Sequence, residues 1–221
     1  MSEGLGAGPA TAVLVSGSGS NLQAIIDQVQ NAQLRIRLAA VLSDVPDALG
    51  LARARDAGIP AVAVDYRGFA DRSAAEQALA GELARVDPEI VVLAGFMRIL
   101  PDPLVETYQG RMLNVHPSLL PKFRGLNTYE RVLAAGDSWH GTTVHFVVPE
   151  LDAGPGIIQY RVAVRSTDDA ASLRARVQHG EYLVYPQAIG WLASGRLSLR
   201  DGAAWLDGKR LGAPVQIDEA L

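Results

Sequence analysis

The sequence contains no cysteine, and this absence excludes several kinds of chemistry. Without a thiol, the chain can form no disulfide, no zinc–thiolate site and no cysteine nucleophile. The composition is compatible with a reducing compartment, and we expect a cytoplasmic protein. Strong charge of one sign is also absent, because the formal net charge is −4 and lysine and arginine are scattered along the chain. We therefore expect no nucleic acid and no membrane among the partners.

Long hydrophobic runs are missing as well. The longest apolar stretch, residues 90–100, is interrupted by Arg98 and covers about half of the ~20 residues that a membrane-spanning helix needs. The first apolar run is broken at Gly17, too early for a signal peptide. No stretch resembles a linker or an internal repeat. We predict a disordered lead-in over residues 1–10, a single domain over residues 11–212 and a flexible tail over residues 213–221.

Strand-like and helical runs alternate through the first half of the chain. Alternation of this kind, with nearly continuous apolar strands, is typical of a parallel sheet covered by helices on both faces. Ligands bind to such sheets at the carboxyl ends of the strands. The expected strands are residues 11–16, 36–43, 61–65, 90–93 and 112–115, and the expected helices are residues 22–29, 49–57 and 71–86.

The second half of the chain has a different pattern. It predicts strands over residues 141–148 and 156–164, a long helix over residues 170–191 and a hairpin over residues 197–206. With 48% hydrophobic residues, the chain can bury a sizeable core. We therefore predict an α/β fold, a mostly parallel, twisted, Rossmann-like sheet flanked by helices, with an antiparallel addition at the carboxyl end.

Two polar side chains stand at the end of one expected strand. Asn114 and His116 follow an apolar run, and Pro117 favours an extended backbone at His116. Residues two apart on an extended segment project from the same side. An amide can donate to a developing negative oxygen, and an imidazole can give or take a proton near neutral pH. Asp152, which opens a Gly/Pro-rich turn, is the natural candidate to orient His116.

Structural roles are the alternative for these residues, because asparagine often forms turns and a His-Pro pair can simply end a strand. A metal site built from His116, His145 and Asp152 is a further alternative, although we expect no metal. His140 and His145 are five residues apart on one expected strand, so they point to opposite faces and cannot jointly bind a metal ion.

The segment SGSGSNL, residues 16–22, lies between the first strand and a helix. Its glycines allow a sharp turn, and a helix start presents backbone N–H groups to an anion. Leu22 stands where the dinucleotide fingerprint has its third glycine, and the lysine of a P-loop is missing. A phosphomonoester therefore fits better than a pyrophosphate. The alternative is that Ser20 merely caps the helix.

Several motifs occur in an order that resembles the phosphoribosylglycinamide formyltransferase family, in its stand-alone bacterial form. They are SGSGSNLQAII, VLAGFMRIL, LNVHPSLLP, HGTTVHFV, ELDAGPGI and AAWLDGKRL, and they span nearly the whole chain. The resemblance implies transfer of a formyl group from 10-formyltetrahydrofolate to the amine of 5-phosphoribosylglycinamide, in purine biosynthesis. It implies a reduced folate as co-substrate, and we expect a monomer or a homodimer.

The resemblance also implies roles for particular residues. Those matching the catalytic trio are Asn114, His116 and Asp152. Those matching the ribonucleotide site are Gly19, Ser20, Asn21 and Glu181. Those matching the folate site are Arg72, Met97, Arg98, Ile99 and Leu100. The sequence departs from the family pattern at Arg124 and Asn127, which puts any auxiliary role of that loop in doubt.

Other functions remain open at this point. Methionyl-tRNA formyltransferase and formyltetrahydrofolate deformylase share the Asn, His and Asp signature, but each carries an additional domain for which we see no room. A nicotinamide-dependent dehydrogenase or a non-catalytic phosphate-binding module would use the same kind of sheet. The missing third glycine argues against the dehydrogenase. A catalytic trio at one strand end argues against a mere binding module.

Overall fold

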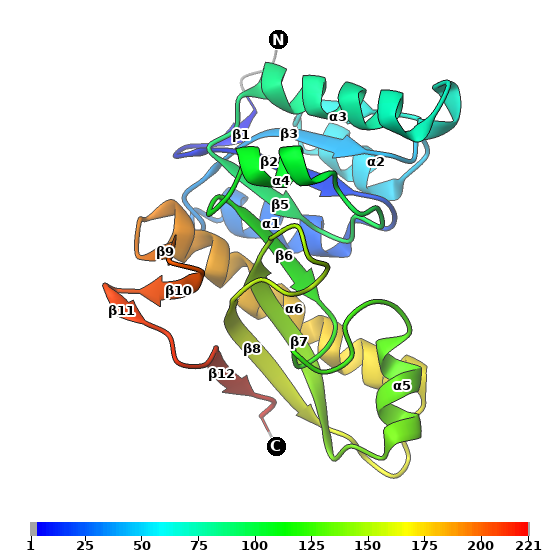
Figure 1. The fold of residues 1–221 in the computed structure, drawn as a ribbon, viewed down its shortest axis with the longest axis vertical. Helices are drawn as coiled ribbons and strands as arrows, with labels where there is room; N and C mark the ends of the chain where they lie inside the picture. The colour runs from blue at the N-terminus through cyan, green and yellow to red at the C-terminus, as the bar shows by residue number, and fades with distance from the viewer. Residues whose placement is uncertain (1–3, 221) are drawn as a thin grey trace. The chain divides into compact units, whose positions relative to one another are not determined.

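The computed structural model describes residues 4–220. The chain divides into two compact units, Met1–Met112 and Leu113–Leu221, which we call unit 1 and unit 2. Figure 1 shows the order of the elements along the chain. Each unit contains its own β-strands and helices.

Unit 1 contains a mostly parallel sheet. Its strands lie in the order β1 (Leu5–Gly6), β3 (Arg37–Ser43), β2 (Ala10–Val15) and β5 (Ile90–Leu93), with β4 (Ala61–Ala63) beside β3. Only β1 is antiparallel to its neighbour. Every residue of β2 and β5 is buried. Strands with no exposed face require cover on both sides of the sheet, and this explains why, apart from Thr11, their residues are apolar.

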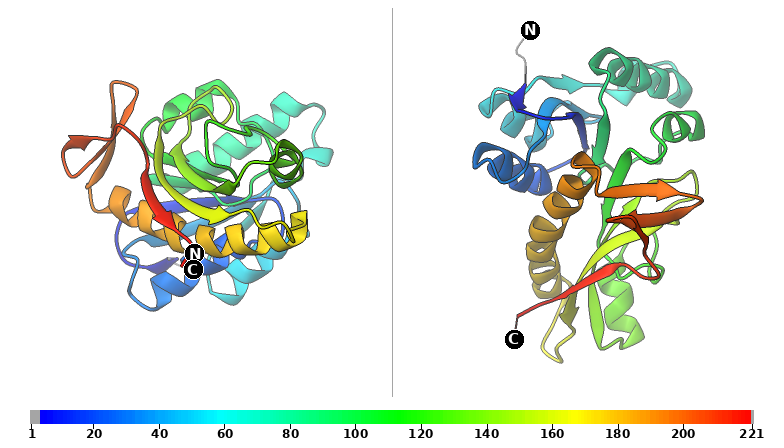
Figure 2. Two further views of the ribbon diagram at one scale, coloured as in Figure 1. Left: turned by 90° about the horizontal axis from the view of Figure 1, so that it is seen from below. Right: turned by 90° about the vertical axis from the view of Figure 1, so that its left-hand side faces the viewer.

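The helices of unit 1 provide that cover. They are α1 (Ser20–Gln30), α2 (Leu49–Asp56), α3 (Arg72–Val86) and the short α4 (Asp102–Thr107), with a 3₁₀ turn η1 (Tyr66–Gly68). The crossovers through α1 and α2 step outward from β2 to β3 to β4, whereas α3 returns the chain to β5. Because such crossovers are right-handed, α1 and α2 cover one face and α3 the other. Figure 2 shows α1 and α3 on opposite sides of these strands.

Unit 2 contains a mixed sheet and a long helix. The sheet order is β6 (Met112–His116), β7 (Trp139–Phe146), β8 (Gly156–Ala163) and β12 (Val215–Asp218). The first three strands are antiparallel, and β12 is parallel to β8. Helix α6 (Ala170–Ala193) packs on β7 and β8, and α5 (Thr128–Ala135) packs on α6. A separate antiparallel sheet consists of β9 (Leu197–Arg200), β10 (Ala203–Leu206) and β11 (Lys209–Arg210).

The predicted fold class is confirmed. The parallel strands of unit 1 are flanked by helices on both faces, and β9 to β11 are the antiparallel addition at the carboxyl end. The expected strands and helices are all present, with boundaries that differ by up to two residues. Helix α5 and the strands β1, β11 and β12 were not expected. No helix among residues 4–220 is both long and apolar enough to cross a bilayer.

Two of the unexpected strands lie at the ends of the chain. Strand β1 falls within the expected lead-in and pairs with β3, and β12 falls within the expected tail and pairs with β8. Two ion pairs hold this part of the chain, because Arg161 binds Asp218 of β12 and Arg176 binds Glu219, the residue after the strand. These residues therefore have regular structure where the sequence suggested none. Residues 1–3 and 221 of the lead-in and the tail lie outside the described residues, and the single-domain boundaries remain a prediction.

Candidate active site

His116 and Asp152 lie side by side in unit 2. His116 is the last residue of β6, where the strand ends before Pro117. Its Nδ1 is 3.3 Å from Oδ2 of Asp152, and the two side chains are 8% and 7% exposed. Its Nε2 is 3.0 Å from the carbonyl oxygen of Phe123, which can only accept a hydrogen bond. Both ring nitrogens therefore face acceptors, and only a doubly protonated ring can donate to both.

Asp152 is held in place by the backbone around it. Its φ of 50° lies in the left-handed region, which aspartate tolerates better than most residues. The N–H of Gly125 donates to Oδ2 at 2.9 Å. The turn passes so close to β7 that a Cβ on Gly154 would lie 1.7 Å from the carbonyl oxygen of Phe146, which requires glycine there. The Gly/Pro-rich sequence thus brings the carboxylate against His116, as the sequence suggested.

Asn114 is paired with His145. The two residues are opposite each other on β6 and β7, and Nδ2 of Asn114 is 3.1 Å from Nε2 of His145. The other ring nitrogen, Nδ1, donates to the carbonyl of Phe146 at 2.8 Å. Burial lowers the pKa of His145 to about 4, so the ring is neutral at pH 7 and Nε2 accepts from the amide. This contact fixes the orientation of Asn114 and leaves its second amide hydrogen for another acceptor.

The cluster of Asn114, His116, His145 and Asp152 combines a fixed amide donor with an imidazole–carboxylate pair. The carboxylate also faces His145, whose Nε2 is 3.8 Å from Oδ1 of Asp152. Among residues 4–220, no group of three or more histidine, aspartate or glutamate side chains is arranged to hold a metal ion. The arrangement suits proton transfer together with stabilisation of a negative oxygen.

The glycine–serine loop in unit 1 leads directly into α1. Gly19 is the N-cap, with a φ of 66°, and a Cβ there would lie 2.6 Å from Cα of Gly50. Arg53 fixes the loop from the side, because its Nε donates to the carbonyl of Ser18 at 2.9 Å. Ser20 and Asn21 are the first two residues of the helix. The loop therefore has the geometry expected of an anion-binding helix start, and its ligand remains a prediction.

The segment Met97 to Leu100 follows β5 in unit 1. Met97 and Ile99 are 69% and 55% exposed, while Leu100 is buried. The Nε of Arg98 donates to Oδ2 of Asp44 at 2.6 Å. Nη2 of Arg72 donates to the carbonyl of Ile99 at 3.0 Å. Both arginines that the sequence assigned to folate binding thus contact this part of unit 1 itself, while the exposed apolar side chains remain available to a ligand.

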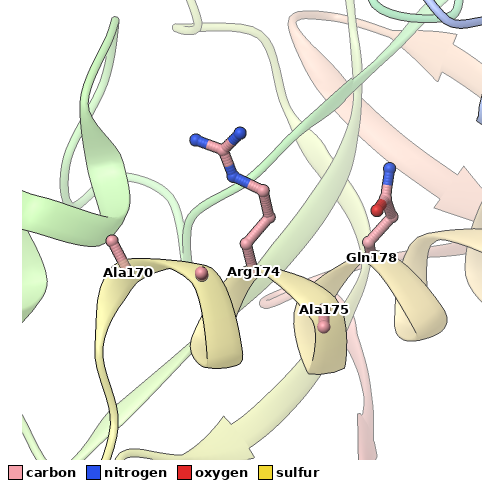
Figure 3. A pocket seen from close by; sticks show the side chains of 5 residues that line it. Ala170, Arg174, Ala175 and Gln178 are labelled. Carbon is pink, nitrogen blue, oxygen red and sulfur yellow. The ribbon is translucent and has the colours of Figure 1, made fainter.

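Glu181, which the resemblance places in the ribonucleotide site, lies on α6 and is 7% exposed. A pocket of ≈ 420 Å³ on the same helix is lined by Ala170, Ala171, Arg174, Ala175 and Gln178. Figure 3 shows Arg174 and Gln178 projecting from the same side of α6. The guanidinium of Arg174 lies 5.1 Å from the centre of the Tyr129 ring. Burial, with a contribution from the charge of Glu181, raises the pKa of Tyr129. Gln178 is one helical turn from Glu181 and was not singled out from the sequence.

The structure thus brings the expected trio together in unit 2 and places Gly19, Ser20, Asn21, Arg72 and the segment Met97 to Leu100 in unit 1. Sequence reasoning undervalued His145 and missed Asp44. Asp44 directly follows the carboxyl end of β3, so its position after a strand was the signal that could have revealed it. The role of His145 depends on strand pairing, which the sequence does not give.

Comparison with known proteins shows the class to which the chain belongs. A family model described as formyl transferase matches residues 10–189. The chain belongs to this family, and the protein is a formyl-transferring enzyme.

Particular relatives narrow the class. The chain is 50% identical to phosphoribosylglycinamide formyltransferase of Escherichia coli (strain K12) over 199 residues, which cover 90% of this chain and 94% of the relative. It is 43% identical to the Haemophilus influenzae protein of the same name over 200 residues, 90% of this chain and 94% of the relative. The solved structure of the Coxiella burnetii phosphoribosylglycinamide formyltransferase has a TM-score of 0.89 and 44% identity, and the match covers 94% of this chain and 99% of that one.

Proposed function

We propose that this enzyme transfers the formyl group of 10-formyltetrahydrofolate to the amine of 5-phosphoribosylglycinamide, a step of purine biosynthesis. The amine attacks the formyl carbon directly, and the resulting tetrahedral intermediate collapses with release of the folate nitrogen. The relatives that share the name phosphoribosylglycinamide formyltransferase support the substrates. The single observation that supports the mechanism is the cluster of Asn114, His116, His145 and Asp152.

Asn114 stabilises the negative oxygen of the tetrahedral intermediate in this mechanism. One amide hydrogen is used by His145, so the second hydrogen has a fixed direction before the reaction begins. A donor held in advance costs no reorganisation when charge develops. A hydrogen bond of this kind contributes about 10²-fold or more to the rate.

His116 and Asp152 move the protons. The imidazole lies beside the carboxylate of Asp152, and in its protonated form it can donate a hydrogen bond to the developing oxygen and then its proton to the departing folate nitrogen. The proton that the attacking amine loses restores the protonated pair. The Nε2 of His116 lies 3.0 Å from the carbonyl oxygen of Phe123. That contact has to be exchanged for one with the substrate before His116 can act on it.

The residues of unit 1 bind rather than react. We assign the phosphate of the ribonucleotide to the backbone of Gly19, Ser20 and Asn21, and the ribose to Glu181 of unit 2. We assign the pterin to the exposed side chains and backbone of residues 97–100, with Arg72 supporting that segment. The enzyme requires no metal in this proposal, acts as a monomer or homodimer, and works in the cytoplasm.

One assay tests the function directly. Loss of the formyl group from 10-formyltetrahydrofolate is followed with and without 5-phosphoribosylglycinamide, together with formation of the formylated ribonucleotide. We expect turnover only when both substrates are present. Formyl loss that proceeds equally well without the ribonucleotide would indicate a deformylase. A rapid burst of formylated enzyme before turnover would contradict direct transfer.

A further inference from the structure

Three consecutive parallel strands of unit 1 end at the same edge of the sheet. In spatial order these are β3, β2 and β5. Ser16 follows β2, Asp44 follows β3, and Met97 and Arg98 lie shortly beyond the end of β5. A backbone hydrogen bond links the segments after β2 and β5, since the N–H of Ser16 donates to the carbonyl of Gly95 at 3.0 Å. Polar side chains from three segments therefore meet at the edge where parallel sheets bind their ligands.

The carboxylate of Asp44 contacts two of these segments. The side chain of Asp44 is only 5% exposed. Its Oδ1 accepts from the hydroxyl of Ser16 at 2.5 Å, and its Oδ2 accepts from Nε of Arg98 at 2.6 Å. The oxygen of Ser16 in turn accepts from the N–H of Met97 at 2.9 Å. These three hydrogen bonds, together with the peptide bond between Met97 and Arg98, form a closed circuit through Ser16 and Asp44.

Two of these residues begin segments with different proposed tasks. Ser16 opens the glycine–serine loop assigned to the ribonucleotide phosphate. Met97 opens the segment assigned to the pterin. Because one carboxylate binds the start of both segments, a displacement of either one changes a hydrogen bond of the other.

The charge of Asp44 also matters. A nearly buried carboxylate beside an anion-binding loop opposes the binding of a phosphate unless a cation neutralises it. Arg98 provides that cation. Its guanidinium is additionally held 4.0 Å from the centre of the Tyr66 ring. Arg98 therefore does more than border a folate site, because its charge compensates Asp44 beneath the phosphate loop.

We propose that Asp44 is a positioning residue that couples the ribonucleotide loop to the folate segment, with Arg98 as the cation that makes its charge compatible with phosphate binding. The inference rests on the proposed function. It predicts that removal of Arg98 weakens the binding of the ribonucleotide as well as of the folate. A residue that only contacts the folate would not have the first effect. The inference also implies that neutralising Asp44 repairs the ribonucleotide part of that defect.

The test uses full-length wild-type protein and the variants Arg98→Ala, Arg98→Gln, Asp44→Asn and Asp44→Asn/Arg98→Ala. Steady-state kinetics give kcat and the KM of each substrate, and thermal unfolding shows that each variant is folded. Arg98→Gln keeps part of the stem over Tyr66 without the charge. Arg85→Ala is the matched control, because Arg85 is an exposed arginine of unit 1 that pairs with Glu82 on α3.

We expect Arg98→Ala and Arg98→Gln to raise the ribonucleotide KM about five- to tenfold and the folate KM by at least as much, with kcat changed less than about threefold. The double variant returns the ribonucleotide KM to within about twofold of wild type but leaves the folate KM raised. Arg85→Ala changes neither constant. An unchanged ribonucleotide KM in both single Arg98 variants, or a double variant no better than Arg98→Ala, would overturn the inference. Absence of formyl transfer in the wild type would instead refute the proposed function.

Discussion

The two units place their polar groups in different ways. In unit 1, the groups come from loops that follow parallel strands, and they hold one another through hydrogen bonds around Asp44. In unit 2, they are side chains of paired strands and of one turn, nearly all buried. All four histidines of the sequence lie in unit 2. The difference fits the division of labour in the proposed function, in which unit 1 is assigned the phosphate and the pterin and unit 2 the groups that move protons.

The largest expected effect tests the chemical half of this comparison. His116→Ala and Asp152→Asn should each lower kcat by about 10²- to 10⁴-fold, because each removes part of a positioned acid–base pair. Circular dichroism and thermal unfolding should show an intact fold. His179→Ala serves as the control, since His179 is an exposed histidine of the same unit. Near-normal turnover in either site variant would contradict the assignment of proton transfer to unit 2.

A second prediction concerns stability at acid pH. Burial lowers the pKa of both His140 and His145 to about 4, from an ordinary value of 6.5. Between these two values the unfolded chain binds protons that the folded chain does not bind, so stability falls as the pH is lowered from about 6.5 to about 4. Each histidine can account for up to about 3 kcal/mol of this loss. Urea unfolding at pH 7.5 and pH 5 measures the difference.

His140→Phe sharpens this test. The ring of His140 packs edge-on against Tyr129, with centroids 5.3 Å apart, and its Nε2 has no hydrogen-bond partner among the described residues. A phenyl ring fits this contact and cannot be protonated. The variant should lose clearly less stability between pH 7.5 and pH 5 than wild type, and hydrogen exchange should show the remaining effect mainly in unit 2. An acid-sensitive unit 1 would contradict the comparison, because unit 1 has no histidine.

The sequence located the proposed reacting groups more completely than the residues that hold them in place. The apolar run before Asn114 and the proline after His116 locate a strand end by local rules, and the Gly/Pro-rich turn marks Asp152. The partner of Asn114 could not be found in this way. His145 becomes its neighbour only through the register of β6 and β7, which depends on contacts between residues far apart in the chain.

The same limit applies to the fold. Alternating runs predicted the parallel sheet of unit 1, because each strand is buried and each helix has a clear start or stop. Strand β12 was missed because it joins β8 through pairing and ion pairs with residues more than forty positions earlier. Helix α5 was missed because it has only eight residues and because Asn127, which precedes it, is as typical of a turn as of a helix start.

A third prediction tests the binding half of the comparison. Ser20→Ala should raise the KM for 5-phosphoribosylglycinamide about five- to tenfold, with kcat changed less than about threefold, because it removes a hydroxyl at the proposed phosphate site and leaves the reacting groups intact. The measurement is a steady-state titration of each substrate. Ser73→Ala, at the exposed start of α3, is the matched control. A kcat defect comparable to that of His116→Ala would show that the loop takes part in the chemical step.

The smallest expected effect tests whether the cluster of Asn114, His116, His145 and Asp152 works independently of the rest of unit 2. Arg161 and Asp218 form a two-bond ion pair between β8 and β12, with contacts of 3.0 Å, and their side chains are 29% and 49% exposed. Solvent screens such a pair, so Asp218→Asn should lower the free energy of unfolding only slightly. It should leave kcat and both KM values unchanged, because the pair contacts none of the proposed site residues. If Asp218→Asn lowered kcat appreciably, proton transfer would depend on the packing of unit 2 as a whole. It could then no longer be assigned to His116 and Asp152 alone, because the pairing of β12 with β8 would also contribute.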